Sequence, residues 1–181
     1  MNRLLAFYSG SHPDDRGRLL ADIVRQDDPW LEVTHDYIQW LFPLRETSRV
    51  VPSAPVIDRE VVAAFRGDDL LQSHLRASFL RMLAFFGLSR RNGAIVKGSN
   101  WAERKHNWFT QGTHNNLRIT RILKSLSTLG LRQDAEDFLA CLEELRDSER
   151  DCGIDEIAYR YWRFALQVDG HAEEPVKGPR L

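Results

Sequence analysis

Apolar side chains recur every three to four residues along most of the chain, which is the pattern of amphipathic helices. The clearest run covers residues 113–129, and a longer run from Asp68 or Asp69 to Phe86 ends at Gly87. We expect the longer helix to lie centrally, because apolar residues surround most of its girth. Its expected core stripe comprises Leu71, Leu75, Phe79, Met82 and Phe86, with Leu80, Leu83 and Phe85 beside it.

Helix start and stop signals place the other elements. Asp28 followed by Pro29 predicts a helix that continues to Pro43. The prolines between Pro43 and Pro55 predict a surface loop. Further helices are expected after Pro13, from Asp58 to Gly67, from Ser99 or Asn100 to Gly112, from Asp134 onward and from Gly153 to Val168.

Strand patterns are scarce in this sequence. No stretch of four or more residues alternates between apolar and polar side chains with turn pairs at its ends. Residues 89–98, which include Asn92-Gly93, are expected to form a loop, because Ile95 and Val96 have no apparent partner strand. The expected fold is all-α, an irregular bundle of about eight helices in a single domain. That domain covers residues 1–170, and residues 171–181 are expected to form a mobile tail.

Composition narrows the function classes. The 181 residues include 25 Lys and Arg and 26 Asp and Glu, without the basic excess typical of a nucleic-acid binder. Cys141 and Cys152 form no Cys-x-x-Cys pair, so we expect two free thiols. The apolar run within residues 1–10 is too short for a signal peptide or a membrane span. We therefore expect a cytoplasmic protein without an anchor or a cofactor.

The sequence contains none of the common enzyme motifs. It has no Gly-rich phosphate loop, no His-Glu-x-x-His and no Gly-x-Ser-x-Gly. Its histidines are not spaced to place two ligands on one helix face, so no metal site is expected. The enzyme alternative is an acid–base site made from His35, Asp36, His106 or His114, at least two of which would have to converge in one pocket.

Two segments, His35–Glu46 and His114–Leu126, combine aromatic, amide and charged residues. A helix start has unpaired N–H groups and a partial positive charge, which suits a carboxylate or a phosphate. Arg118 and Arg121, at i and i+3, can address one anion together. The candidate ligand-binding residues are His35, Tyr37, Gln39, Trp40, Arg45, His114, Asn115, Asn116, Arg118 and Arg121.

The same residues also have a structural interpretation. Tyr37 and Trp40 would be core aromatics with satisfied polar tips, and the two asparagines would cap their helix. The two arginines would then pair with carboxylates of this chain. We expect a mixed outcome, in which Arg121 is structural and Arg118 lies nearer any ligand.

The segments Tyr37–Glu46 and His114–Leu126 resemble the conserved region of the opioid growth factor receptor family. A looser resemblance, in the same order, extends from Leu19 to Phe164, but Asp28-Pro29-Trp30 departs from the family's more acidic and aromatic approach. Animal members are described as receptors for an enkephalin-type pentapeptide that act on cell growth. They are associated with the nucleus and carry long tails after this region, and the tail functions are not expected here.

The resemblance supplies no catalytic residues. It implies a non-enzymatic module that binds a short peptide or a protein segment, and a peptide with a free carboxylate would suit the arginines. The acid–base enzyme is one alternative to this hypothesis. A purely structural assembly domain is another, and a large exposed apolar patch would mark it.

Overall fold

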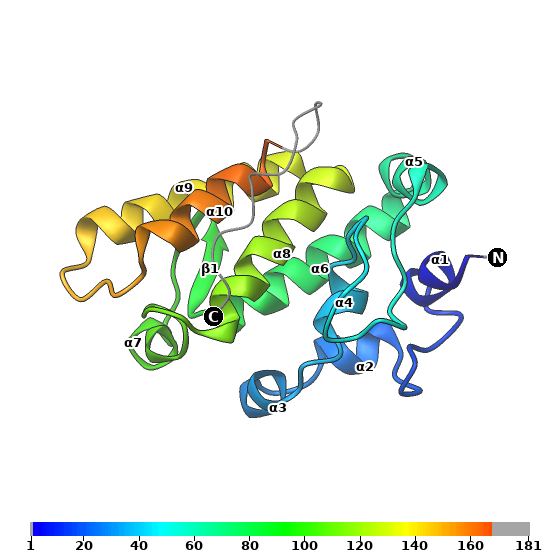
Figure 1. Ribbon diagram of the computed structural model, residues 1–181, viewed down its shortest axis with the longest axis horizontal. Helices are drawn as coiled ribbons and strands as arrows, with labels where there is room; N and C mark the ends of the chain where they lie inside the picture. The colour runs from blue at the N-terminus through cyan, green and yellow to red at the C-terminus, as the bar shows by residue number, and fades with distance from the viewer. Residues whose placement is uncertain (1, 168–181) are drawn as a thin grey trace.

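The computed structural model describes residues 2–167, and most of its elements are helices (Figure 1). The mostly helical, single-domain fold expected from the sequence is confirmed. The expected mobile tail, residues 171–181, lies outside the described residues. In chain order the elements are α1 (Arg3–Tyr8), α2 (Leu20–Val24), α3 (Asp28–Val33), α4 (Ile38–Leu41), α5 (Arg59–Gly67), α6 (Asp69–Phe85), β1 (Leu88–Arg91), β2 (Ala94–Lys97), α7 (Trp101–Arg104), the 3-10 helix η1 (Lys105–Asn107), α8 (His114–Thr128), α9 (Arg132–Ser148) and α10 (Glu156–Ala165).

Helices α6 and α8 run through the middle of the molecule (Figure 1). Helices α9 and α10 pack against α8, whereas α1, α2 and α5 pack against α6. Phe79 and Met82 of α6 are fully buried, as the apolar stripe predicts. Phe79 contacts Phe138 of α9, with 5.5 Å between the ring centroids. Leu80 was expected beside the stripe but is exposed, so the apolar face of α6 is narrower than predicted.

The boundaries of α5 and α6 follow the predicted capping signals. The side chain of Asp58 accepts a hydrogen bond from the Val61 amide at 2.8 Å, and Asp68 does the same for Leu71 at 3.1 Å. Gly87 ends α6 with a φ of 80°. A Cβ atom there would lie 2.9 Å from the Cα of Trp101, so only glycine fits this position without a shift.

The expected loop over residues 89–98 is instead a β-hairpin. Strands β1 and β2 pair antiparallel, with Arg91 opposite Ala94. Asn92 and Gly93 both have positive φ, 50° and 85°, as a two-residue hairpin turn requires. The prediction failed because β1 has the sequence Leu-Ser-Arg-Arg, which lacks strand alternation, although the turn signal itself was present.

The helix expected from Asp28 to Pro43 is broken. Helix α3 ends at Val33 and α4 begins at Ile38, so Thr34–Tyr37 is not helical. The helix expected from Ser99 or Asn100 to Gly112 begins at Trp101, but α7 ends at Arg104 and the following 3-10 helix η1 ends at Asn107. Its predicted cap, Asn100, donates from Nδ2 to the Ala84 carbonyl at the end of α6, and makes no cap bond.

Two other helices differ from the sequence pattern. Helix α1 was not expected, yet it buries Leu4 and Phe7. In α10 the large apolar residue Ile157 and Tyr161 are exposed, while Tyr159 and Trp162 are fully buried. The aromatic residues take the inward positions because their polar atoms find partners. Trp162 Nε1 donates to the Asn116 carbonyl at 3.1 Å, and Tyr159 donates to the Leu142 carbonyl at the same distance.

Replacing Phe79 with alanine tests the central position of α6. Phe79→Ala should lower the free energy of unfolding by about 3–5 kcal/mol, because it leaves a cavity among closely packed rings. The neighbouring variant Leu80→Ala should change it by less than about 0.5 kcal/mol, since Leu80 is exposed. Urea titrations of both variants measure the difference, and equal losses would show that α6 is not the core helix.

Candidate functional site

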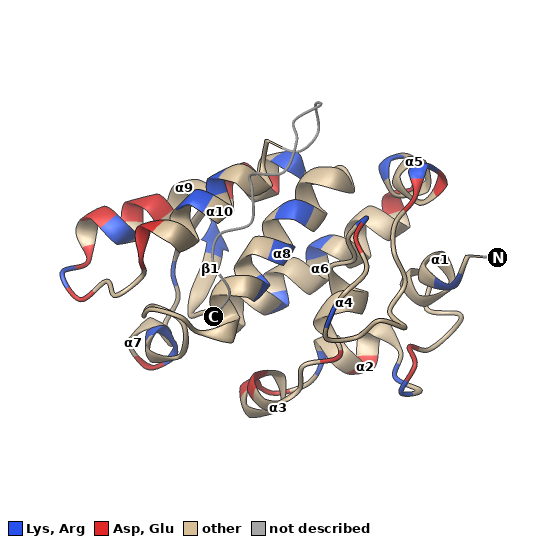
Figure 2. Cartoon of the chain, viewed as in Figure 1, with Lys and Arg blue, Asp and Glu red and all other residues tan. Residues whose placement is uncertain are grey.

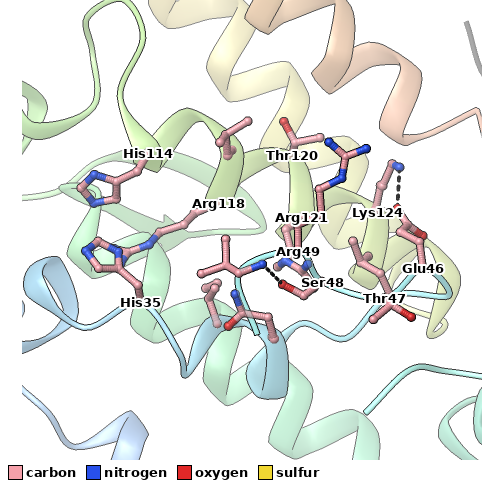
Figure 3. A pocket seen from close by; sticks show the side chains of 15 residues that line it. His35, Glu46, Thr47, Ser48, Arg49, His114, Arg118, Thr120, Arg121 and Lys124 are labelled. Carbon is pink, nitrogen blue, oxygen red and sulfur yellow. Dashed lines mark hydrogen bonds and ion pairs between the residues drawn. The ribbon is translucent and has the colours of Figure 1, made fainter. Parts of the chain in front are cut away.

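Helix α8 divides its side chains between the core and a hollow on the surface. Ile119, Ile122 and Leu126 are fully buried, and Arg118, Arg121 and Lys124 line a cavity of about 480 Å³ between α8 and residues 35–50. We call this cavity the α8 groove. Figure 3 shows His35 and His114 together at one end and Lys124 beside Glu46 at the other.

The α8 groove brings together half of the candidate residues predicted from the sequence. His35, Gln39, His114, Arg118 and Arg121 all line it. They come from the start of α8 and from the chain around α4, so the two unusual segments meet in space. The sequence cannot show this meeting, because the segments lie far apart in the chain.

Two other candidates, Tyr37 and Trp40, are core residues. Both are almost completely buried, and neither lines the α8 groove. The Tyr37 hydroxyl donates to the Leu31 carbonyl at 3.2 Å, and burial raises the pKa of Tyr37 to about 12. The Trp40 ring packs against Phe7, with 5.1 Å between the centroids. Of the two, Tyr37 contacts a residue of the groove, because the guanidinium carbon of Arg118 lies 5.4 Å from the centroid of its ring.

The remaining candidates lie outside the groove. Asn115 and Asn116 are buried and donate to the carbonyls of Asn107 and Thr110, at 3.1 and 3.0 Å, which fixes the loop before α8. They do not cap the helix as expected. Arg45 is exposed and does not line the groove.

Arg118 is a buried guanidinium held by neutral acceptors. Arg118 is only 4% exposed to solvent. Nη1 donates to the Leu31 carbonyl at 2.9 Å, and Nη2 donates to the Thr34 carbonyl at 2.7 Å. These carbonyls lie at the end of α3, so Arg118 satisfies acceptors that the interrupted helix leaves free. Burial lowers the pKa of Arg118, but an arginine still carries its charge at neutral pH.

Arg121 has fewer partners within the protein. Its Nη1 donates to the Phe42 carbonyl at 3.0 Å, and no described carboxylate forms an ion pair with either Arg118 or Arg121. Burial lowers the pKa of Arg121, while the charge of Glu46 acts in the opposite direction. Arg118 is therefore the more deeply embedded arginine, the reverse of the order expected from the sequence.

Charged residues missed by the sequence analysis complete the groove. Lys124 donates from Nζ to Glu46 Oε1 at 2.9 Å. Burial acts to raise the pKa of Glu46, but the hydrogen bond and charge of Lys124 outweigh it and lower the pKa. Arg49 is exposed and forms no hydrogen bond or ion pair with any described residue. Both Glu46 and Arg49 belong to the expected surface loop, whose orientation no local pattern predicts.

The histidines at the end of the groove contact each other edge to face. The ring centroids of His35 and His114 lie 5.0 Å apart, and Nε2 of His114 lies 3.2 Å from Glu32 Oε1. Burial, followed by the charge of Arg118, lowers the pKa of His114. Of the other two groups in the acid–base hypothesis, His106 does not line the groove. Asp36 is paired with Arg16 and Arg18, at 3.0 and 2.9 Å.

A second groove of about 610 Å³ adjoins the first and shares His35 and Val50 with it. Its acidic and basic side chains neutralise one another, because Asp36 holds Arg16 and Arg18. The α8 groove is different, since four cationic side chains face a single carboxylate, that of Glu46. Those four are Arg49, Arg118, Arg121 and Lys124.

Two other kinds of site are absent from residues 2–167. No three or more His, Cys, Asp or Glu side chains within residues 2–167 come together as a metal ion would require. In the same residues, no helix has both the length and the apolar character needed to cross a bilayer.

Arg118 and Arg49 should differ sharply in their effect on stability. Arg118→Ala leaves the carbonyls of Leu31 and Thr34 without donors, and should lower the free energy of unfolding by about 3 kcal/mol. Arg49→Ala removes an exposed side chain and should change it by less than about 0.5 kcal/mol. Chemical denaturation followed by tryptophan fluorescence gives both values. A small loss for Arg118→Ala would mean that the guanidinium does not hold α3.

The chain is similar in sequence to several known proteins. It is 36% identical over 167 residues to the opioid growth factor receptor of Mus musculus, covering 88% of this chain and 26% of that protein. The Homo sapiens receptor is 38% identical over 141 residues, which are 76% of this chain and 20% of the receptor. The opioid growth factor receptor-like protein 1 of Mus musculus is 39% identical over 102 residues, which are 55% of this chain and 22% of that protein.

The chain thus spans about a quarter of the length of the curated receptors that it matches. No solved structure matches it. The family model described as the opioid growth factor receptor conserved region matches residues 5–177, a range that contains every residue of the α8 groove. On this evidence the chain belongs to the opioid growth factor receptor family.

Proposed function

We propose that the chain is a non-enzymatic binding module whose α8 groove takes an acidic segment of a peptide or protein. The surplus of positive charge carries this proposal, because four cationic side chains face one carboxylate in the groove. A ligand carboxylate placed there would gain charge-assisted hydrogen bonds, which are stronger than neutral ones. A C-terminal carboxylate and an Asp or Glu side chain are both suitable.

The side chains at the margin of the groove favour a peptide over a small free anion. Val50 is 71% exposed and Leu117 is 74% exposed, and both line the groove. One comes from the loop and the other from α8, so apolar surface borders the charged floor on two elements. Residues on either side of an acidic group would cover this surface, whereas a small ion would leave it in water.

The way that the protein holds its own cations also supports binding. Arg118 and Arg121 are anchored by backbone carbonyls, which fix their positions without cancelling their charge. Positioned guanidinium groups lose little freedom when an anion arrives, so more of the interaction energy becomes affinity. The family's receptors bear a name that implies ligand reception. For this chain we propose only binding at the groove.

A titration with peptide pools tests the proposed function. Fluorescein-labelled nonapeptides with amidated C-termini and a central Glu should bind, and matched pools with a central Lys should not. Arg121→Gln and Arg49→Gln should each weaken binding by about tenfold or more, since each removes charge-assisted hydrogen bonds worth about 1.5–3 kcal/mol. Binding should also weaken as salt is raised from about 50 to 300 mM.

The matched control for this titration is Arg45→Gln. Arg45 lies in the same loop as Arg49 and is exposed, but it does not line the groove. The control should bind like the parent protein. Equal losses for Arg45→Gln and Arg49→Gln would mean that the peptide responds to overall charge and not to the groove. Absence of binding by every pool would remove the proposed function and favour an assembly domain, which sedimentation would detect.

A further inference from the structure

Two guanidinium groups of the α8 groove retain free donors. Arg121 uses only Nη1, for the Phe42 carbonyl, and Arg49 has no hydrogen bond or ion pair with any described residue. Each guanidinium is a planar fork that can hold two oxygens of one anion. One carboxylate carries a single charge and two oxygens, so it satisfies one fork. The second fork would then remain uncompensated.

The groove already contains a carboxylate of its own. Lys124 donates from Nζ to Glu46 Oε1 at 2.9 Å, so the charge of Lys124 is already neutralised by a carboxylate of the protein. After this pairing, the unpaired charge of the groove belongs to the arginines. A ligand that neutralises Arg49 and Arg121 together needs about two negative charges, which a phosphate monoester carries at neutral pH.

The groove also offers neutral donors, which suit an anion with several oxygens. Thr47, Ser48 and Thr120 line it. The Ser48 oxygen accepts from the amides of Val50 and Val51, at 3.2 and 3.1 Å, and therefore keeps its own proton available for donation.

Gln39 brings a polar group with an unsatisfied acceptor to the groove. Its side chain lines the groove and is only 5% exposed, yet the buried Oε1 has no hydrogen-bond partner among the described residues. A buried carbonyl oxygen that accepts no hydrogen bond is unfavourable. Its amide can turn to offer N–H donors to a phosphoryl oxygen or to accept from a ligand hydroxyl or amide.

We propose that the α8 groove recognises a phosphate monoester on a serine or threonine side chain of a peptide segment. This inference rests on the proposed function and specifies its ligand class. Arg49 and Arg121 hold the phosphoryl oxygens, and Gln39 contributes from the floor. The residues that flank the phosphorylated side chain lie over Val50 and Leu117, which are exposed in the free protein.

The experiment compares three fluorescein-labelled nonapeptide pools that differ only at the central residue, which is Ser, Glu or phosphoserine. The phosphoserine pool should bind about tenfold more tightly than the Glu pool, because it adds a charge and a third acceptor oxygen. The Ser pool should bind more weakly than either. Arg49→Gln and Arg121→Gln should abolish the preference for phosphoserine over Glu, while the matched control Arg45→Gln should keep it.

Glu46→Gln is a variant that should change the affinity in the opposite direction. It removes a negative charge from the groove and frees Lys124, so it should strengthen binding of the phosphoserine pool. Arg49 and Arg45 are exposed, so those two variants test the preference even if Arg121→Gln unfolds. Thermal melting establishes which variants are folded before any titration.

Several outcomes separate this inference from the proposed function. Equal affinity for the Glu and phosphoserine pools would overturn the inference and leave the proposed function standing. A phosphoserine preference that survives in Arg49→Gln and Arg121→Gln would also overturn it, because the site would then lie elsewhere. Inorganic phosphate should displace the phosphoserine pool only at much higher concentration. Displacement at equal concentration would mean that the groove binds a free ion and not a peptide.

Discussion

The buried charge of Arg118 is the constraint on which the rest of this structure depends. Its Nη1 and Nη2 donate to carbonyls of Leu31 and Thr34, 84 or more residues away in the chain, and so join α8 to the end of α3. A buried guanidinium whose donors lack hydrogen-bond acceptors is strongly unfavourable, so the donors and these carbonyls must stay together. The gap between α3 and α4 supplies those acceptors. In a continuous helix, the carbonyls of Leu31 and Thr34 would instead accept hydrogen bonds from backbone amides four residues later.

Fixing Arg118 also fixes which side chains of α8 reach the surface hollow. Arg121 lies at i+3 from Arg118, and Lys124 lies at i+3 from Arg121, so all three share a flank of the helix. The opposite flank, with Ile122 and Leu126, is buried. Because carbonyls rather than carboxylates hold the arginines, the flank keeps its charge. In the second groove the cations are neutralised instead, because Asp36 pairs with Arg16 and Arg18 and leaves little net charge for a ligand.

Local signals predicted the parts of the fold that local physics determines. The period of α6 gave the burial of Phe79, and Asp58 and Asp68 capped their helices as expected, because a cap needs only neighbouring amides. Elements that depend on distant partners were missed. The break before Tyr37 needs Arg118, and strand β1 needs its hairpin partner. In the site, sequence identified Arg118 and Arg121 but not Arg49, whose position depends on how a whole loop folds over α8.

The net charge of −1 gives a misleading view of the surface, because opposite charges are separated in space. Figure 2 shows basic residues spaced along α8, while acidic residues gather where α9 ends and α10 begins. An anion at such a surface experiences mainly the nearby charges, because charges farther away than about 8 Å are largely screened in physiological salt. Net charge therefore does not decide whether one short acidic group can bind in one groove. The proposed anion site needs only the local excess of cations in the α8 groove, on a chain with slightly more acidic than basic residues.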